Sequence, residues 1–176
     1  MNIIFIGYRG TGKSTIAKIV SQKLNKNLYV LDALISYSAG MSIQKIVAKW
    51  GWKRFREMES FQIKHITKRA KNSIIDCGGG AVLNPDNTNY LKQTGKMILL
   101  QAPLETILKR IRPDSKRPAL KKGISFEDEQ KKVLEEREPL YQNAADLVFD
   151  TTTNSPEEKA NQIIQTIIEN GWIKNA

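Results

Sequence analysis

The chain has little of the chemistry that builds disulfide scaffolds or histidine-based sites, since its 176 residues include one cysteine and one histidine. A single cysteine, Cys77, cannot form an internal disulfide, which argues against a disulfide-stabilised secreted domain. The sequence also lacks any apolar run near the roughly 20 residues that a transmembrane helix needs. Its first apolar run, Ile3–Ile6, is too short for the core of a signal peptide. We therefore expect a cytoplasmic protein that does not insert into a membrane.

Acidic residues are also scarce, because 28 Lys plus Arg oppose 18 Asp plus Glu and leave a formal net charge of +10. Such an excess favours anionic partners, from nucleic acids and membrane surfaces to small phosphates and carboxylates. No nucleic-acid recognition motif accompanies the charge, so we expect no nucleic-acid partner. Many of the basic residues gather in one segment that is interrupted by prolines and a glycine, which predicts a basic loop: Lys109, Arg110, Arg112, Lys116, Arg117, Lys121 and Lys122.

Short apolar segments alternate along the chain with longer stretches of helical periodicity. Parallel strands need long crossovers, and these are usually helices, so the alternation predicts a parallel sheet with helices on both faces. We expect a single three-layer α/β/α domain over residues 1–176, with a central, mostly five-stranded parallel sheet. The predicted strands are Ile3–Ile6, Leu28–Leu31, Ser73–Asp76, Met97–Leu100 and Leu147–Phe149.

Two helices carry their own boundary signals. Apolar residues recur at helical spacing between Lys13 and Leu24, directly after a glycine-rich turn. Ser155, Pro156 and Glu158 have the pattern of an N-cap, a first-turn proline and a capping-box partner, which predicts a C-terminal helix.

The residues from Gly7 to Ser14 read GYRGTGKS and satisfy the pattern G-x-x-x-x-G-K-[ST] between a predicted strand and a predicted helix. Glycines let the backbone amides point inward, and the following helix presents the positive end of its dipole to phosphates. Lys13 is expected to reach the terminal phosphates of ATP, and the Ser14 hydroxyl to bind Mg²⁺. We assign ATP binding to Gly10, Thr11, Gly12, Lys13, Ser14 and Thr15.

A phosphate loop does not identify the acceptor, because GTPases, ATPases and kinases share it. The chain has no N-K-x-D guanine signature, and it is too short for the additional parts of a motor. A small kinase is the better interpretation.

Five further motifs occur in the order found in one enzyme family, which the chain resembles from Ile3 to about Asp150: the shikimate kinases. The resemblance implies a P-loop kinase fold and transfer of the ATP γ-phosphoryl group, with Mg²⁺, to shikimate in aromatic amino-acid biosynthesis. The motifs are Asp32 after the second strand, Phe55-Arg56-Glu57-Met58-Glu59, Gly78-Gly79-Gly80, Lys116-Arg117-Pro118-Ala119-Leu120 and Arg137-Glu138-Pro139-Leu140-Tyr141.

Each substrate-side motif also has a physical interpretation of its own. Gly78, Gly79 and Gly80 follow a strand directly, so a ligand can approach bare backbone at the edge of the sheet where open α/β folds bind ligands. Arg56 and Arg137 are suited to hold a carboxylate through charge-assisted hydrogen bonds. Glu59 lies one helical turn from Arg56 and is positioned to hold its guanidinium group.

Asp32 is the carboxylate nearest the end of the second strand, and we expect it to orient the attacking hydroxyl and accept its proton. The resemblance implies that Arg117 acts as a catalytic residue over the transferring phosphoryl group, within a lid at about residues 112–124. It also implies that Arg110 lies against one side of the adenine, with the loop at residues 151–155 on the adenine's other side. Residues 33–62 would form a substrate-binding helical segment.

The chain departs from the family pattern at three positions. Shikimate kinases typically have D-x-D where this chain has Val30-Leu31-Asp32, and the missing carboxylate helps them hold Mg²⁺ through water. The glutamates usual at Ser36 and Trp52 are absent as well. Asp76, at the end of the third predicted strand, is a hypothetical substitute that would hold a magnesium-bound water.

We predict that the chain is a monomeric shikimate kinase with ATP and shikimate as its small-molecule ligands. Two alternatives stay open: a kinase of another small hydroxy acid such as gluconate, and a nucleotide-binding relative whose turnover is lost through Val30. The three tryptophans, Trp50, Trp52 and Trp172, are expected to pack within the protein and not to stack on a ligand.

Overall fold

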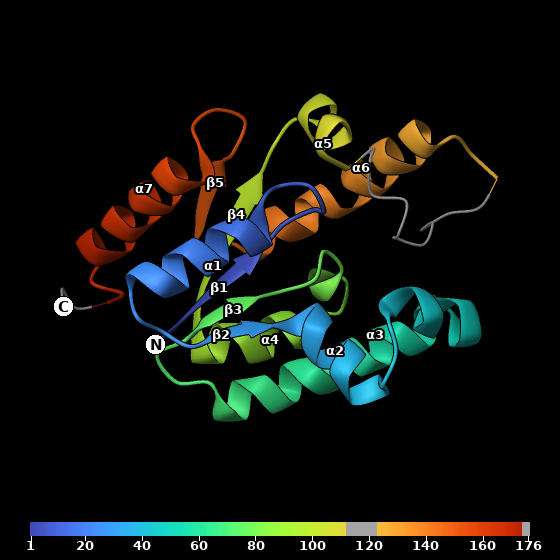
Figure 1. Ribbon diagram of the computed structural model, residues 1–176, viewed down its shortest axis with the longest axis horizontal. Coiled ribbons are helices and arrows are strands. Elements are labelled where there is room, and N and C mark those ends of the chain that lie inside the picture. Colours follow the sequence, from blue (N-terminus) through green and yellow to red (C-terminus); the bar gives the residue numbers. More distant parts are fainter. Residues whose placement is uncertain (112–122, 174–176) are drawn as a thin grey trace.

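A computed structural model describes residues 1–111 and 123–173 of the chain. Within them five parallel strands form one sheet in the order β2-β3-β1-β4-β5 (Figure 1). This confirms the predicted five-stranded parallel sheet. The predicted strand boundaries differ from the observed ones by one or two residues, and the difference at β2 changes the element, because Leu31 begins a helix and does not end a strand. The strands are β1 (Asn2–Ile6), β2 (Leu28–Val30), β3 (Ile74–Asp76), β4 (Gly95–Gln101) and β5 (Leu147–Asp150).

Helices cover both faces of the sheet, so the three-layer prediction is also confirmed (Figure 1). Successive residues of β1 alternate between two apolar clusters, as the side-chain period of a strand requires. The helices are α1 (Lys13–Lys23), α2 (Leu31–Ala39), α3 (Ile43–Arg69), α4 (Pro85–Thr94), α5 (Leu104–Ile111), α6 (Phe126–Ala144) and α7 (Pro156–Glu169), with the 3₁₀ helix η1 (Ala81–Leu83).

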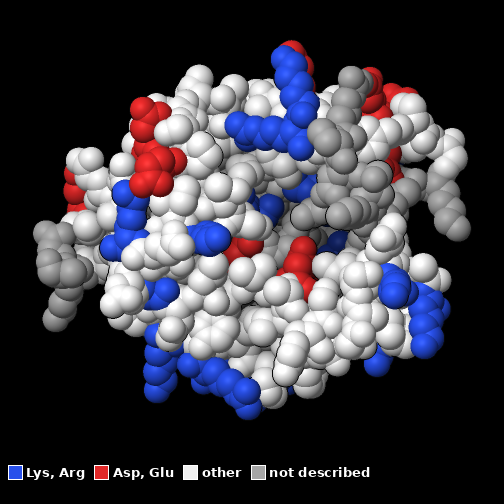
Figure 2. All heavy atoms as spheres, viewed as in Figure 1, with Lys and Arg blue, Asp and Glu red and all other residues white. Residues whose placement is uncertain are grey.

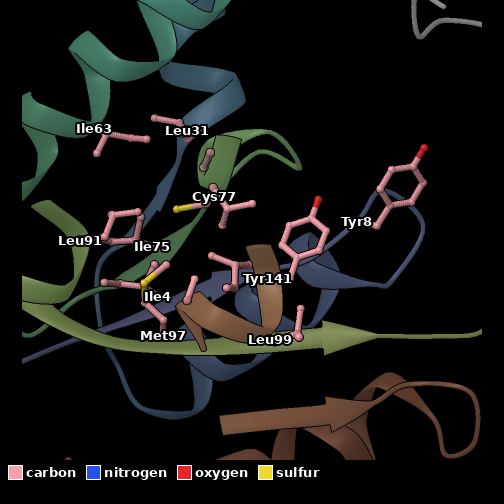
Figure 3. Packing of buried hydrophobic residues seen from close by; sticks show 14 of the residues in the cluster. Ile4, Tyr8, Leu31, Ile63, Ile75, Cys77, Leu91, Met97, Leu99 and Tyr141 are labelled. Atoms are coloured by element: carbon pink, nitrogen blue, oxygen red, sulfur yellow. The ribbon is translucent and has the colours of Figure 1, made fainter. Parts of the chain in front are cut away.

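The core has two halves, one on each face of the sheet. On one face, Ile3 and Phe5 of β1 pack with buried residues of α1 and α7. On the other, Ile4 packs with residues such as Ile75, Leu91 and Met97, beneath α3, α4 and α6 (Figure 3). β1 is buried at every residue, as expected for the central strand of a parallel sheet.

Strand order places the functional loops. β1 pairs with β3 on one side and with β4 on the other. The chain therefore leaves the middle of the sheet in two directions, and ligands of open α/β folds bind at the carboxyl ends of the strands at such a point. The loop after β1 holds the predicted phosphate-binding residues, and the loop after β3 holds the glycine triplet.

Local capping agrees with the sequence at the C-terminal helix. The Ser155 side chain accepts from the backbone of Glu158, and the Glu158 carboxylate accepts from the backbone of Ser155, which makes the predicted capping box before α7. Among the described residues, no helix is both long enough and apolar enough to cross a lipid bilayer. Residues 112–122, with most of the predicted lid and Arg117, lie outside the described residues.

Candidate functional site

The loop from Gly7 to Ser14 follows β1 and ends where α1 begins. Its glycines are required by space as well as by conformation. A Cβ atom on Gly7 would lie 2.2 Å from the carbonyl oxygen of Leu100, and Gly10 has φ +80°. Gly12 is the N-cap residue of α1, and no side chain of the described residues caps this helix. The backbone amides of its first turn therefore face the loop as hydrogen-bond donors.

The Tyr8 carbonyl organises this loop internally. Lys13 donates to it from Nζ at 2.8 Å, and Thr11 donates to it from Oγ1 at 2.7 Å. Lys13 is buried and Ser14 and Thr15 are exposed at the start of α1. The structure thus brings the predicted ATP-binding residues Gly10 to Thr15 into one loop around the helix N-terminus.

Arg110 of α5 also contacts the phosphate loop, at Gly10. Its Nη1 donates to Thr151 Oγ1 at 3.1 Å and to the Gly10 carbonyl at 3.3 Å, and its Nη2 donates to the Thr151 carbonyl at 2.6 Å. Thr151 in turn donates to the carbonyl of Thr11 at 3.0 Å. Arg110 therefore contacts the loop after β5 directly, whereas the resemblance implied that the adenine lies between them; the contact of Arg110 with the adenine stays a prediction.

A cavity of about 580 Å³ opens next to the phosphate loop. Figure 2 shows basic and acidic side chains together in the hollow at the centre of this face. Eight of the predicted site residues line the cavity, although they come from five separate segments of the chain: Lys13, Ser14, Asp32, Arg56, Gly78, Gly79, Gly80 and Arg137.

Arg56 enters the cavity from α3. Its Nη1 donates to Glu59 Oε2 at 2.6 Å, and its guanidinium group lies over the rings of Phe55 and Trp52 at 5.1 and 5.4 Å from their centroids. Glu59 is fully buried, so the carboxylate of this ion pair is held in place by the surrounding protein. The predicted positioning of Arg56 by Glu59 is thus present in the geometry.

Glu59 and Asp32 converge on Gly78. A Cβ atom there would lie 2.8 Å from Asp32 Oδ1 and 2.9 Å from Glu59 Oε1, so only glycine leaves room for both carboxylates. Glu59 Oε1 has no hydrogen-bond partner among the described residues. Burial raises the pKa of Glu59 above its ordinary value, and the positive charge of Arg56 opposes this shift.

Arg137 and Tyr141 lie one helical turn apart on α6, and both hold the glycine triplet. Arg137 donates from Nη1 to the Gly79 carbonyl at 3.0 Å, and the Tyr141 hydroxyl donates to the same oxygen. Burial raises the pKa of Tyr141 to about 12, so its hydroxyl keeps the proton that it donates. The motif at residues 137–141 predicted a role for Arg137 but none for Tyr141.

Val30, which stands where the family has an aspartate, has a carboxylate residue beside it on the adjacent strand. Val30 pairs in register with Asp76 of β3, and both residues line the cavity with Ser14. Asp76 is buried, with 4% of its surface exposed. No group of three or more Asp, Glu, His or Cys residues in the described chain is placed to hold a metal ion by itself. A carboxylate and a hydroxyl still suit Mg²⁺, which takes its remaining ligands from phosphates and water.

The tryptophan predictions are confirmed only in part. Trp172 packs against the cluster of α1 and α7, as expected. Trp50 is 43% exposed, so the expectation that it packs inside is wrong. Trp52 packs edge-on against Phe55 at 5.5 Å between ring centroids, yet it also forms part of the cavity wall.

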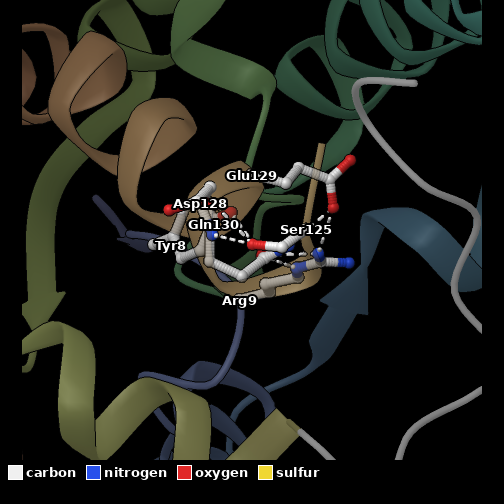
Figure 4. Close-up of polar contacts among 6 residues, drawn as sticks. All are labelled: Tyr8, Arg9, Ser125, Asp128, Glu129 and Gln130. Atoms are coloured by element: carbon white, nitrogen blue, oxygen red, sulfur yellow. Dashed lines mark hydrogen bonds and ion pairs between the residues drawn. The ribbon is translucent and has the colours of Figure 1, made fainter. Parts of the chain in front are cut away.

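Sequence reasoning missed a polar cluster on the phosphate-loop side of α6. Tyr8 and Arg9 of the loop contact Gln130 and Glu129, which are both buried (Figure 4). One signal was available: Gln130 lies on the inward face of α6, in helical register with buried Val133, Arg137 and Tyr141. Buried polar residues on such a face need hydrogen-bond partners.

A phosphate loop on a parallel sheet, with a cavity beside it lined by the three arginines Arg9, Arg56 and Arg137, defines a P-loop kinase of small molecules. A family model described as "Shikimate kinase" matches residues 9–168. The chain belongs to the shikimate kinase family.

Two curated relatives illustrate the match. The shikimate kinase of Caldicellulosiruptor bescii is 39% identical over 163 residues, which cover 93% of each chain. That of Caldanaerobacter subterraneus subsp. tengcongensis is 39% identical over 171 residues, which cover 96% of each chain. The resemblance to the family, inferred from motifs, is confirmed.

Solved structures give the same result. A shikimate kinase from Acinetobacter baumannii in complex with shikimate is similar with a TM-score of 0.90 and 31% identity, covering 96% of this chain and 93% of that one. The shikimate kinase of Aquifex aeolicus has a TM-score of 0.80 and 30% identity, covering 97% and 98%. The predicted P-loop kinase fold is confirmed.

Proposed function

We propose that the protein transfers the γ-phosphoryl group of ATP to a hydroxyl of shikimate, giving shikimate 3-phosphate and ADP for aromatic amino-acid biosynthesis. One observation carries the proposal: Arg56 and Arg137 line the same cavity as Lys13 of the phosphate loop. A donor with a triphosphate and an acceptor with a carboxylate therefore fit side by side. Family membership supports both ligands.

The acceptor end is proposed to work through charge-assisted hydrogen bonds. Arg56 is held by buried Glu59, and Arg137 by the Gly79 carbonyl, so both guanidinium groups are positioned before a ligand binds. Because their orientation is already fixed, less side-chain entropy is lost when the carboxylate binds. Each charge-assisted bond contributes about 1.5 to 3 kcal/mol.

Asp32, beside Gly78, is proposed to orient the acceptor hydroxyl and receive its proton. Lys13, buried at the phosphate loop, is proposed to neutralise the charge that develops on the transferred group. Phosphoryl transfer depends mainly on such positioning and charge neutralisation. Arg117 is proposed to assist Lys13 from the lid, although it lies outside the described residues.

Mg²⁺ is the cofactor that we propose, held by the Ser14 hydroxyl with help from Asp76. These two side chains supply the oxygen ligands that Mg²⁺ prefers. Both line the cavity, and Asp76 lies on the strand next to Val30. When bound, the ion neutralises phosphate charge and aligns the donor. We further propose that the protein acts as a monomer in the cytoplasm.

The test is ADP release from the purified protein, measured by a coupled assay with shikimate, with gluconate and with no acceptor. Shikimate-dependent release supports the proposal, and release with gluconate alone would identify a different hydroxy-acid kinase. ATP binding without any acceptor-dependent release would identify the protein as a nucleotide-binding relative without turnover.

The variant Arg137→Lys tests the carboxylate clamp in the same assay. Lysine keeps the charge but loses the planar fork, so we expect KM for shikimate to rise by about tenfold or more. Arg54→Lys is the matched control, because Arg54 forms an exposed ion pair with Glu57 on the surface of α3. An unchanged KM in Arg137→Lys would contradict the clamp.

A further inference from the structure

The buried amide of Gln130 joins α6 to the phosphate loop. Its Oε1 accepts from the Tyr8 hydroxyl at 2.7 Å and from Arg9 Nε and Nη2 at 2.8 and 2.5 Å (Figure 4). Its Nε2 donates to Glu129 Oε2 at 2.7 Å. Since arginine only donates and an ionised carboxylate only accepts, these partners leave one orientation for the amide.

The cluster is enclosed, so its hydrogen bonds hold a single geometry. Gln130 is 0% exposed, Glu129 3% and Tyr8 2%. Burial raises the pKa of Tyr8, which keeps the hydroxyl protonated as a donor. Arg9 also pairs with Glu129 at 3.6 Å and lies over the ring of Phe126 at 5.7 Å from its centroid. A buried polar group that loses its partner is costly, so the cluster resists rearrangement.

Tyr8 carries this restraint into the nucleotide site. At one end its hydroxyl is fixed by Gln130, and at the other its carbonyl accepts from Lys13 Nζ and Thr11 Oγ1. A shift of the Tyr8 ring therefore shifts the carbonyl on which Lys13 rests. The path from Gln130 to Lys13 runs through one residue.

We propose that Gln130 is a positioning residue for ATP, which fixes the phosphate loop through Tyr8 and Arg9. The proposal rests on the proposed kinase function for its nucleotide. It assigns α6 two tasks at different points of the helix, because Arg137 and Tyr141 of the same helix hold the glycine triplet on the acceptor side. Gln130 acts on the nucleotide side.

The test compares Gln130→Met with Tyr8→Phe and with the double variant. Methionine keeps the length of the side chain, but its sulfur accepts only weakly from Tyr8 and Arg9 and cannot donate to Glu129. We expect Kd for MgATP, measured by calorimetry without an acceptor, to rise about tenfold in Gln130→Met. KM for shikimate should rise less than Kd for MgATP does, because Arg137, although it lies over the Tyr8 ring at 6.0 Å from the centroid, keeps its bond to the Gly79 carbonyl. Tyr8→Phe should also raise Kd for MgATP. Because the two residues act through one hydrogen bond, the rise in Kd in the double variant should be smaller than the product of the rises in the two single variants.

Gln142→Met is the matched control. Gln142 lies on the exposed side of the same helix and donates to Gln101 at 3.0 Å. It should bind ATP as the wild type does. If Gln130→Met does not fold, Tyr8→Phe, which removes only one hydroxyl, carries the test through its ATP affinity.

Three results would overturn the proposal: unchanged ATP affinity with a lower melting temperature, equal loss of affinity for both substrates, or independent effects of the two substitutions. The kinase function fails separately. A wild-type protein that binds MgATP but does not phosphorylate shikimate refutes that function, while the calorimetric test of Gln130 still applies.

Discussion

The guanidinium group of Arg56 lies against the backbone of Gly80. A Cβ atom at Gly80 would fall 2.0 to 2.3 Å from Nη1, Cζ and Nη2 of Arg56, which is closer than any real contact. The third glycine of the triplet is therefore required by the position of an arginine that comes from another helix. This contact joins two motifs that the sequence shows separately.

Gly80→Ala should displace Arg56 from the cavity. The methyl group and the guanidinium group cannot occupy the same space, and Arg56 is held on its other side by Glu59. Binding then loses a charge-assisted carboxylate contact, so we expect KM for shikimate to rise about tenfold or more, with little change in KM for ATP. Steady-state kinetics, with shikimate and ATP varied in turn, measure the two KM values.

Gly79→Ala is the matched comparison for that variant. A methyl group there would meet its nearest atoms at 3.5 to 3.6 Å, which is ordinary contact. Its effect on KM for shikimate should be clearly smaller. Equal effects of the two alanines would contradict the role of the Arg56 contact.

Glu59 should make stability depend on pH. Burial raises its pKa above 4.5 in the folded protein, so the folded state holds this proton more tightly than the unfolded chain does. Between the two pKa values unfolding releases the proton, and the free energy of unfolding falls as the pH rises from about 4.5. Glu59→Gln lacks this contribution.

Urea unfolding between about pH 4 and pH 7 measures the effect. The wild-type free energy of unfolding, relative to that of Glu59→Gln, should decrease with rising pH and then become constant. The matched control is Glu57→Gln, which removes an exposed carboxylate from the same helix. A relative stability that increases with pH would show that the ion pair with Arg56 outweighs burial.

Tyr141→Phe should loosen the glycine triplet without emptying the core. The Gly79 carbonyl keeps its bond from Arg137 and loses the one from the tyrosine hydroxyl. We expect a loss of about 1 kcal/mol in the free energy of unfolding. Because the pKa of Tyr141 is raised to about 12, the wild-type rate should show no inflection from this group below pH 11 or so. A Tyr141→Phe variant with wild-type stability would refute the bond's contribution.

Asp76→Asn tests whether Asp76 supports Mg²⁺ in place of the carboxylate missing at Val30. The amide has nearly the same size but no charge, so the metal should bind more weakly while the strand keeps its shape. We expect the Mg²⁺ concentration for half-maximal activity to rise about fivefold to tenfold. A magnesium titration at saturating ATP checks it, and an unchanged curve would reject the role.

The local features of this protein could be predicted because they depend on neighbours in sequence. The five strands, the glycine turn before α1 and the capping box at Ser155 each follow from the composition of a few adjacent residues. The end of β2 was missed because Leu31 is apolar and fits either a buried strand or the first turn of a buried helix.

The site was predicted as separate motifs, and the fold decided how they meet. Arg56, Gly80 and Arg137 were each identified from their motifs, yet the contact of Arg56 with Gly80 is visible only when α3 packs beside the loop after β3. The role of Tyr141 was missed for the same reason, since its partner is a backbone carbonyl 62 positions away.

The amino-acid sequence by itself determined the parallel sheet, the phosphate loop and the family, because hydrophobic period, glycine positions and motif order are written along the chain. Only the tertiary structure decided which distant residues meet: Gln130 accepts from Tyr8, 122 positions away, and Val30 lies beside Asp76 on the adjacent strand. The reason is physical. Burial and hydrogen bonding between distant residues depend on how the layers stack, and no local pattern in the chain specifies the distance between two such side chains.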